Sequence, residues 1–137
     1  YNGSVKQYYH GLYLSIVDNV VIDKLDASHN LTGMGLKITD FYDDRTETSV
    51  SVKNSKFNYN YDRGVTVYHI NNLYVEGNEA RDNGKSGINI IDCQNGTLKN
   101  NNAYNNPMAA NVSYDIWLNA SSGFTISGNT YGSKQGF

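Results

Sequence analysis

The stretch that decides the fold is residues 87–106, which read GINIIDCQNGTLKNNNAYNN. It contains a glycine, a short alternating apolar strand, a polar corner, a second short strand and an asparagine-rich corner. The same order of features recurs upstream in residues 64–83, GVTVYHINNLYVEGNEARDN, and downstream from residue 115. A period of this length indicates a solenoid, in which each repeat buries its apolar face only against its neighbours.

Five equivalent positions begin the repeats and are separated by 24, 29, 23 and 28 residues: Gly11, Gly35, Gly64, Gly87 and Asp115. We expect a sixth repeat to begin at Gly136. Successive residues of a strand point to opposite faces, so alternate positions sort into stacked columns. Two columns are aliphatic throughout: Leu12, Leu36, Val65, Ile88 and Ile116, and Leu14, Ile38, Val67, Ile90 and Leu118. They predict an all-β parallel β-helix of about five coils.

Later positions of the repeats form further columns. A second strand contributes Ile22, Val52, Val75, Leu98 and Ile126, and two corners contribute Leu25, Ser55, Asn78, Asn101 and Asn129, and Asn30, Asn60, Asn83 and Asn106. Asparagines stacked at corners can hydrogen-bond to their equivalents one coil away and so satisfy the backbone groups of a tight turn. The longer intervals place insertions at residues 41–49 and 107–114.

Composition restricts the class of protein. The 137 residues carry a net charge of -2, which gives no electrostatic footprint for nucleic acid. Apolar residues come in runs of three to five, so we expect no insertion into a membrane. The single cysteine, Cys93, excludes an internal disulfide and a cysteine-based zinc site. We expect one domain over residues 1–137, truncated at both ends from a longer β-helix, because neither terminus reads as a cap.

The outward positions of the first strands predict a binding face. Its rows are Tyr13, Lys37, Thr66, Asn89 and Trp117, then Ser15, Thr39, Tyr68, Ile91 and Asn119, and, just before each strand, His10, Met34, Arg63, Ser86 and Tyr114. Aromatic rings stack on sugars, amides bond hydroxyls and cations meet carboxylates, so these rows suit an elongated polar polymer. The predicted substrate-binding residues are His10, Tyr13, Asn89, Trp117 and Asn119. The alternative is an ordinary exposed sheet face, because aromatic residues and threonine are good strand formers.

Three residues of this face could carry chemistry. Lys37, Arg63 and Tyr68 lie on adjacent predicted coils. β-Elimination from a uronic acid needs a cation against the carboxylate and a base for the neighbouring carbon proton. Arg63 suits the first role, and Lys37 or Tyr68 suits the second if its pKa is lowered. The alternative is a solvated lysine and arginine beside a surface tyrosine.

A second candidate cluster lies five residues after each start, where Asp40, His69 and Asp92 stack over successive coils. Two carboxylates around a histidine can perform acid/base work or bind a cation. The alternative is a corner at which aspartate bonds backbone amides. Asp43 and Asp44 in the first insertion could add calcium ligands, although their spacing matches no known calcium loop. Calcium aside, we expect no metal or cofactor.

The coils of residues 64–83 and 87–106 resemble those of the bacterial right-handed β-helix superfamily. That group includes mannuronan C5-epimerases, pectate-lyase-like enzymes, periplasmic NosD-type proteins and phage tailspikes. The sequence of these coils is most similar to that of the catalytic module of the epimerases, whose hallmark is Tyr-Gly-Phe-Asp-Pro-His at the start of one coil. The best-aligned stretch here is residues 63–68, RGVTVY, so Thr66 and Tyr68 stand where the motif has its aspartate and histidine. Lys37 occupies a place where the family's lysine could lie.

The resemblance implies a right-handed β-helix that acts on carbohydrate outside the cytoplasm, as an extracellular, cell-surface or virion protein. Our leading hypothesis is binding of a polysaccharide, for which acidic polymers and cleavage both stay open. One alternative is a non-catalytic structural or receptor-binding rod of a phage tail or adhesin, which would be a homotrimer if tailspike-like. The other is a polysaccharide lyase, C5-epimerase or glycoside hydrolase whose active residues lie partly outside this segment.

Overall fold

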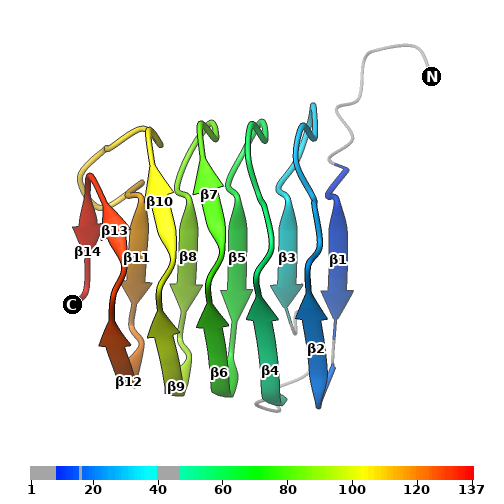
Figure 1. Cartoon of the computed structure of the whole chain (residues 1–137), viewed down its shortest axis with the longest axis vertical. Coiled ribbons are helices and arrows are strands. Elements are labelled where there is room, and N and C mark those ends of the chain that lie inside the picture. Colours follow the sequence, from blue (N-terminus) through cyan, green and yellow to red (C-terminus); the bar gives the residue numbers. More distant parts are fainter. Residues whose placement is uncertain (1–8, 16, 40–46) are drawn as a thin grey trace.

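The chain winds into a rod of stacked coils whose strands form three parallel sheets (Figure 1). The computed structural model describes residues 9–15, 17–39 and 47–137. Sheet A has the order β1 (Leu12–Ser15), β3 (Leu36–Thr39), β5 (Val65–Tyr68), β8 (Ile88–Ile91), β11 (Ile116–Asn119) and β14 (Lys134–Gln135). Sheet B has β2 (Val20–Asp23), β4 (Glu47–Lys53), β6 (Ile70–Glu76), β9 (Gln94–Lys99) and β12 (Ser122–Ser127). Sheet C has β7 (Glu79–Arg81), β10 (Asn102–Tyr104) and β13 (Thr130–Tyr131).

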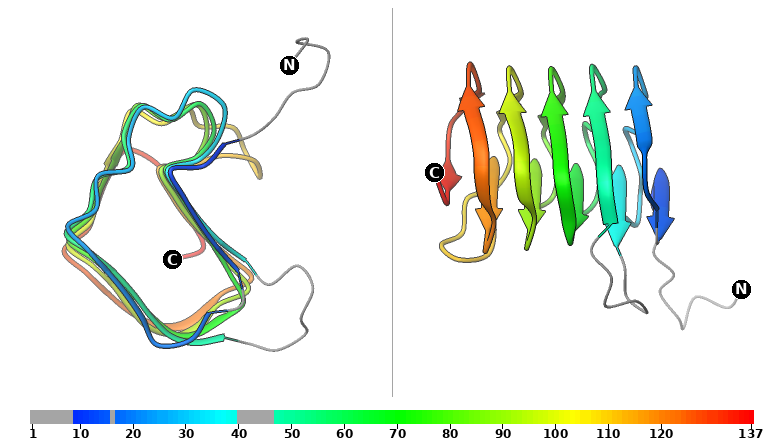
Figure 2. Two further views of the ribbon diagram at one scale, coloured as in Figure 1. Left: turned by 90° about the vertical axis from the view of Figure 1, so that its right-hand side faces the viewer. Right: turned by 90° about the horizontal axis from the view of Figure 1, so that it is seen from below.

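The predicted columns are confirmed. Strand pairing stacks Leu14 on Ile38, Ile38 on Val67, Val67 on Ile90 and Ile90 on Leu118. In the second strand, Val52 pairs with both Ile22 and Val75, and Leu98 with both Val75 and Ile126. The middle members of these columns are fully buried, whereas Leu12 and Leu14 of the first described coil are only partly covered. Viewed along the rod, the coils nearly superpose (Figure 2, left).

Amide side chains hold two corners together, as the sequence predicts. At one corner the side-chain oxygen of Asn78 accepts from the Ser55 N–H, and that of Asn101 accepts from the Asn78 N–H. At the other corner the same contacts join Asn30, Asn60, Asn83 and Asn106. Each of these bonds therefore joins a backbone N–H of one coil to the side chain of the next coil.

A turn between sheets B and C requires a left-handed backbone in every coil. Lys24, Asn54, Gly77, Asn100 and Gly128 have φ between 49° and 68° at this position. Asparagine and glycine tolerate this conformation better than other residues, which explains why they alternate along the column.

The sixth coil begins earlier than predicted. The pairing of β14 places Lys134 beside Ile116, so Ser133, and not Gly136, is the equivalent of Asp115. Ser133 is fixed there because its backbone N–H donates to the Asp115 carboxylate and its carbonyl accepts from the Ile116 N–H. The glycine–aromatic pair at residues 136–137 instead brings Phe137 against the end of the core.

The other sequence expectations about the fold have mixed outcomes. Part of the first predicted insertion, residues 47–49, belongs to β4. The second insertion is a turn closed by an Ala109–Ser113 bridge. Cys93 is a buried thiol whose Sγ lies 3.3 Å from the Ile91 carbonyl oxygen. Among the described residues there is no helix with the length and hydropathy needed to span a membrane.

Candidate functional site

The outer face of sheet A carries the predicted rows of side chains in register. Tyr13, Lys37, Thr66, Asn89 and Trp117 follow one another across five strands. In the axial view, the loops that precede sheet A extend outward before the chain bends back into the strands (Figure 2, left). We call the outer face of sheet A, together with the residues just before its strands, the sheet A groove.

The amino-terminal part of the groove holds a compact set of predicted site residues. A hollow of about 350 Å³ is lined by Tyr9, His10, Tyr13 and Lys37. The His10 ring stacks on Tyr13 with 5.9 Å between centroids, and the Lys37 ammonium lies 5.7 Å from the centroid of the same tyrosine ring. The structure thus brings His10, Tyr13 and Lys37 together at one place.

Burial shifts the titration of two of these groups. Burial, and then the charge of Lys37, lower the pKa of His10 below its ordinary value of 6.5, while Asp62 acts in the opposite direction. His10 Nδ1 accepts a hydrogen bond from the Met34 N–H at 3.0 Å, which leaves the proton of the neutral ring on Nε2. Burial also lowers the pKa of Lys37, opposed by Asp62 and reinforced by Arg63. Both groups favour their neutral forms more than they would in water.

Asp62 is the site residue that sequence reasoning missed. Its Oδ1 lies 3.5 Å from Arg63 Nη1 and 3.4 Å from Lys85 Nζ, and its charge also acts on His10 and Lys37. Its negative charge offsets the mutual repulsion of the Lys37, Arg63 and Lys85 side chains. In the sequence, Asp62 stands directly before Arg63. The outward rows that predicted the groove begin at Arg63 in this coil, so they left Asp62 out.

The centre of the groove differs from the predicted open surface. Thr66 is fully buried and Asn89 is 1% exposed. Within the part of the chain that the structure describes, four buried side-chain atoms have no hydrogen-bond partner: Asp62 Oδ1, Arg63 Nε, Thr66 Oγ1 and Asn89 Oδ1. Asn89 is therefore buried and is not an exposed binding residue, contrary to the prediction. Asp62 Oδ1 still has its ion-pair contacts with Arg63 and Lys85. For the other three atoms the lack of a partner is costly, and they mark a place for water or a polar ligand group.

The carboxyl-terminal part of the groove is aromatic. Trp117 meets Tyr114 edge to face, with 5.4 Å between the ring centroids. The Tyr114 hydroxyl accepts from the Asn111 N–H at 2.9 Å, so the insertion at residues 107–114 fixes this ring. Trp117 itself is partly exposed. A partly exposed indole held from one side suits contact with a sugar ring.

Tyr68 and Asn119 occupy the far ends of their strands. Tyr68 lies two residues beyond Thr66 on β5, which is about 7 Å farther along the strand at the usual rise. Asn119 is the last residue of β11. Both are partly exposed, and neither lines the hollow beside Lys37. Of the proposed chemical trio, Lys37 and Arg63 are close enough for their charges to interact.

His69 and Asp92 form a pair at a corner of the coils. His69 Nε2 lies 2.9 Å from Asp92 Oδ2, and both side chains are about half exposed. His69, Asp92 and Ala120 have φ of 55°, 51° and 49°, so this column is a left-handed turn at the end of sheet A. The turn favours the corner interpretation, with an ion pair across two coils. Asp40, Asp43 and Asp44 lie outside the described residues, within which no group of three potential metal ligands occurs.

The sequence model of the family described as "Right handed beta helix region" matches residues 2–136. The chain therefore belongs to the right-handed β-helix family, in agreement with the resemblance drawn from its coils.

Two solved structures share the fold, and both are of the periplasmic alginate epimerase AlgG. One, of a T265N T268M double mutant, superposes with a TM-score of 0.61, and the other superposes with a TM-score of 0.59. Each is 20% identical in sequence and covers 92% of this chain, which spans about a third of the length of AlgG (34% and 35%). No curated protein sequence gives a significant match.

Proposed function

We propose that this β-helix binds an acidic polysaccharide along the sheet A groove. The observation that carries the proposal is the grouping of His10 and Lys37 around the Tyr13 ring, with the charges of Arg63 and Asp62 acting on Lys37. Cations pair with the carboxylates of a uronic acid polymer, and aromatic rings at both ends of the groove contact its sugar faces. The fold shared with an alginate epimerase supports the same substrate class, and its periplasmic location supports an exported protein.

Titration of the chain with alginate and with polygalacturonate oligomers, followed by calorimetry, tests the proposal. We expect Lys37→Ala to weaken binding by about tenfold, the loss of one charge-assisted contact. Trp117→Ala should weaken binding as well. Lys99→Ala is the matched control, because Lys99 is exposed on sheet B. Equal affinity of Lys37→Ala, Trp117→Ala and Lys99→Ala would contradict the groove as the binding site.

A second candidate is proton abstraction from the bound uronate, as in a lyase or epimerase. The lowered pKa of Lys37 supports it, because a neutral amine can accept the proton on the carbon next to the carboxylate. Arg63 would hold the carboxylate while it takes up negative charge. In a lyase, the bond to the leaving sugar oxygen then breaks with its electron pair, and that oxygen takes a proton from solvent.

Incubation with alginate separates the two candidates. A lyase yields unsaturated uronate ends, which absorb in the ultraviolet, and an epimerase exchanges the abstracted proton with deuterium from solvent. Loss of either signal in Lys37→Gln at alginate concentrations that saturate the variant would support chemistry at Lys37. Binding with unchanged polymer would leave the chain as a binding module or a structural rod.

A further inference from the structure

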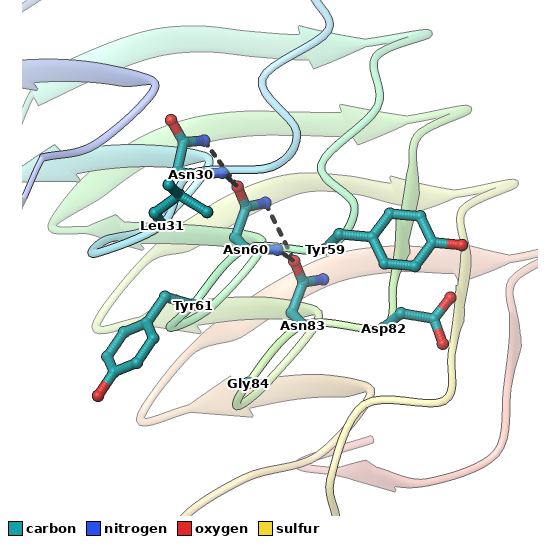
Figure 3. Close-up of a pocket in the computed structure, with 8 residues that line it drawn as sticks. All are labelled: Asn30, Leu31, Tyr59, Asn60, Tyr61, Asp82, Asn83 and Gly84. Carbon is teal, nitrogen blue, oxygen red and sulfur yellow. Dashed lines mark hydrogen bonds between the residues drawn. The ribbon is translucent and has the colours of Figure 1, made fainter.

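The insertion at residues 107–114 lengthens the link between the asparagine ladder and sheet A. In the preceding coil this link starts at Gly84, directly after the ladder residue Asn83 (Figure 3). Asn83 stands five residues before the start of β8, whereas Asn106 stands ten residues before the start of β11 (88 − 83 and 116 − 106). The insertion therefore adds five residues directly before the strand that carries Trp117.

The insertion folds on itself as a compact turn. Backbone hydrogen bonds join Ala109 and Ser113 in both directions, at 3.0 and 2.9 Å. The Ser113 hydroxyl also donates to the Pro107 carbonyl at 2.5 Å. These bonds fix the course of the chain up to Tyr114, the residue at which the insertion ends.

Tyr114 is held at its backbone and at its hydroxyl. Its N–H donates to Ser86 Oγ at 3.1 Å, and its carbonyl accepts from the Gly87 N–H at 3.2 Å. Its hydroxyl accepts from the Asn111 N–H at 2.9 Å, and the residue is only 8% exposed. A buried ring that is hydrogen-bonded at both ends has little freedom to turn.

Trp117 packs against this fixed ring. Pairing with Asn89 and Gln135 holds the Trp117 backbone in β11, but its side chain is partly exposed. The Tyr114 ring meets the indole at an interplanar angle of 69°, the edge-to-face arrangement that aromatic pairs prefer. An indole that is ordered before a ligand arrives loses less entropy on binding.

The same two positions carry rings at the amino-terminal part of the groove. His10 and Tyr13 are the equivalents of Tyr114 and Trp117, and their rings stack with 5.9 Å between centroids. The three coils between have no aromatic residue at the first of these positions, which holds Met34, Arg63 and Ser86. At both ends of the groove, a ring directly before the strand therefore supports a ring within the strand.

We propose that Tyr114 is a positioning residue, which holds the Trp117 indole in the orientation that stacks on a sugar ring of the bound polysaccharide. The sugar contact rests on the proposed function, whereas the order of the indole is a property of the free chain. The insertion contributes to binding through the Asn111 N–H and the Tyr114 ring, without contact between these groups and the ligand.

Fluorescence of the free chain gives the first test, because Trp117 is the one tryptophan of the sequence. We expect the emission anisotropy of the native chain to decay with the tumbling of the whole molecule. Tyr114→Leu should add a fast component from local motion of the indole. Tyr114→Phe keeps the ring and loses the bond to Asn111, so its fast component should be present but smaller.

Val112→Ala is the matched control, because Val112 lies in the same insertion and is 53% exposed. It should leave the anisotropy decay unchanged. The unfolding midpoint of each variant checks that it is folded. The absence of a fast component in both folded Tyr114 variants would overturn the inference.

Alginate binding, followed by calorimetry, gives the second test. Tyr114→Leu should weaken binding by about threefold to tenfold, the cost of ordering one side chain on binding. The double variant with Trp117→Ala should bind no more weakly than Trp117→Ala alone, because Tyr114 acts only through the indole. With Lys37→Ala, three strands and roughly 14 Å away, the two losses should multiply.

Losses that also multiply in the double variant with Trp117→Ala would overturn the positioning role. A native chain that binds no alginate would instead contradict the proposed function. The fluorescence would then still decide whether Tyr114 orders Trp117.

Discussion

One hydrogen bond determines the protonation state of His10. Its Nδ1 can accept from the Met34 N–H only when that nitrogen carries no proton. Burial and the nearby Lys37 lower its pKa in the same direction. His10 is therefore a neutral donor in the groove at physiological pH, and proton uptake removes the bond to Met34.

This makes stability depend on pH in a defined direction. The pKa of His10 is lower in the folded state than its ordinary value of 6.5, so the unfolded chain binds more protons as pH falls through that value. The stability that neutral His10 contributes is fully present above pH 6.5 and is lost as the pH falls below this value. We expect the free energy of unfolding to fall between about pH 7.5 and pH 5.5, and to fall less in His10→Asn, whose amide oxygen can replace the acceptor without titrating.

Urea unfolding of both proteins at the two pH values measures the effect. The difference between the two proteins isolates His10 from the other titrating groups. A loss of stability that is equal in both would show that His10 has no part in it.

The asparagine ladders are the elements that hold the coils in register at the corners. Asn83 accepts from the Asn60 N–H and side-chain amide, and it donates to the Phe57 carbonyl and the Asn106 side chain. At its carboxyl-terminal end the ladder finishes on Asp115. That carboxylate accepts from Asn106 on one side and from the Gly132 and Ser133 N–H groups on the other.

Removal of a central rung should be costly. We expect Asn83→Ala to lower the free energy of unfolding by about 3 kcal/mol or more, since each buried polar group left unpaired costs roughly 1–3 kcal/mol. Asn102→Ala is the control, because Asn102 is exposed and its side chain accepts a surface hydrogen bond from the Thr130 hydroxyl. The control should change stability by at most about 0.5 kcal/mol. Equal effects in urea unfolding would show that the ladder does not stabilise the stack.

The whole molecule is a stack in which each coil depends on its neighbours. Ile90 is fully buried between Val67 and Leu118, whereas Ile126 lies in β12, the edge strand of sheet B, and is 36% exposed. A central coil is covered on both sides and a terminal coil on one. The same substitution should therefore have different effects along the rod.

We expect Ile90→Ala to cost about 2–5 kcal/mol and Ile126→Ala about 1 kcal/mol or less. Urea unfolding of the two variants measures the difference. The identical change of residue makes each variant the control for the other. Comparable losses at both positions would contradict a stability that is built from neighbouring coils.

The fold could be predicted because its signal is periodic and local. Leu14, Ile38 and Val67 fall at equivalent positions of successive repeats, and Asn60 and Asn83 do the same at the corner. The start of the sixth coil was predicted wrongly. Gly136–Phe137 has the sequence pattern of a coil start, but strand pairing and the hydrogen bonds of Ser133 make Ser133 the equivalent residue. The sequence pattern also predicted that Lys37, Arg63, His10 and Tyr13 lie on one face, because the register of the coils decides which outward residues are neighbours.

The sequence by itself determined the coils, their register and the chemistry available on each face, since alternation and repeat length are properties of the chain alone. The tertiary structure decided which of those residues make a site. Burial of Thr66 and Asn89, the placing of Asp62 against Arg63 and Lys85, and the close approach of Gly84 to the Tyr61 carbonyl depend on how loops from different coils pack. The contacts of Asp62 with Lys85 and of Gly84 with Tyr61 join different coils, 23 positions apart (85 − 62 and 84 − 61), and no short-range pattern contains them.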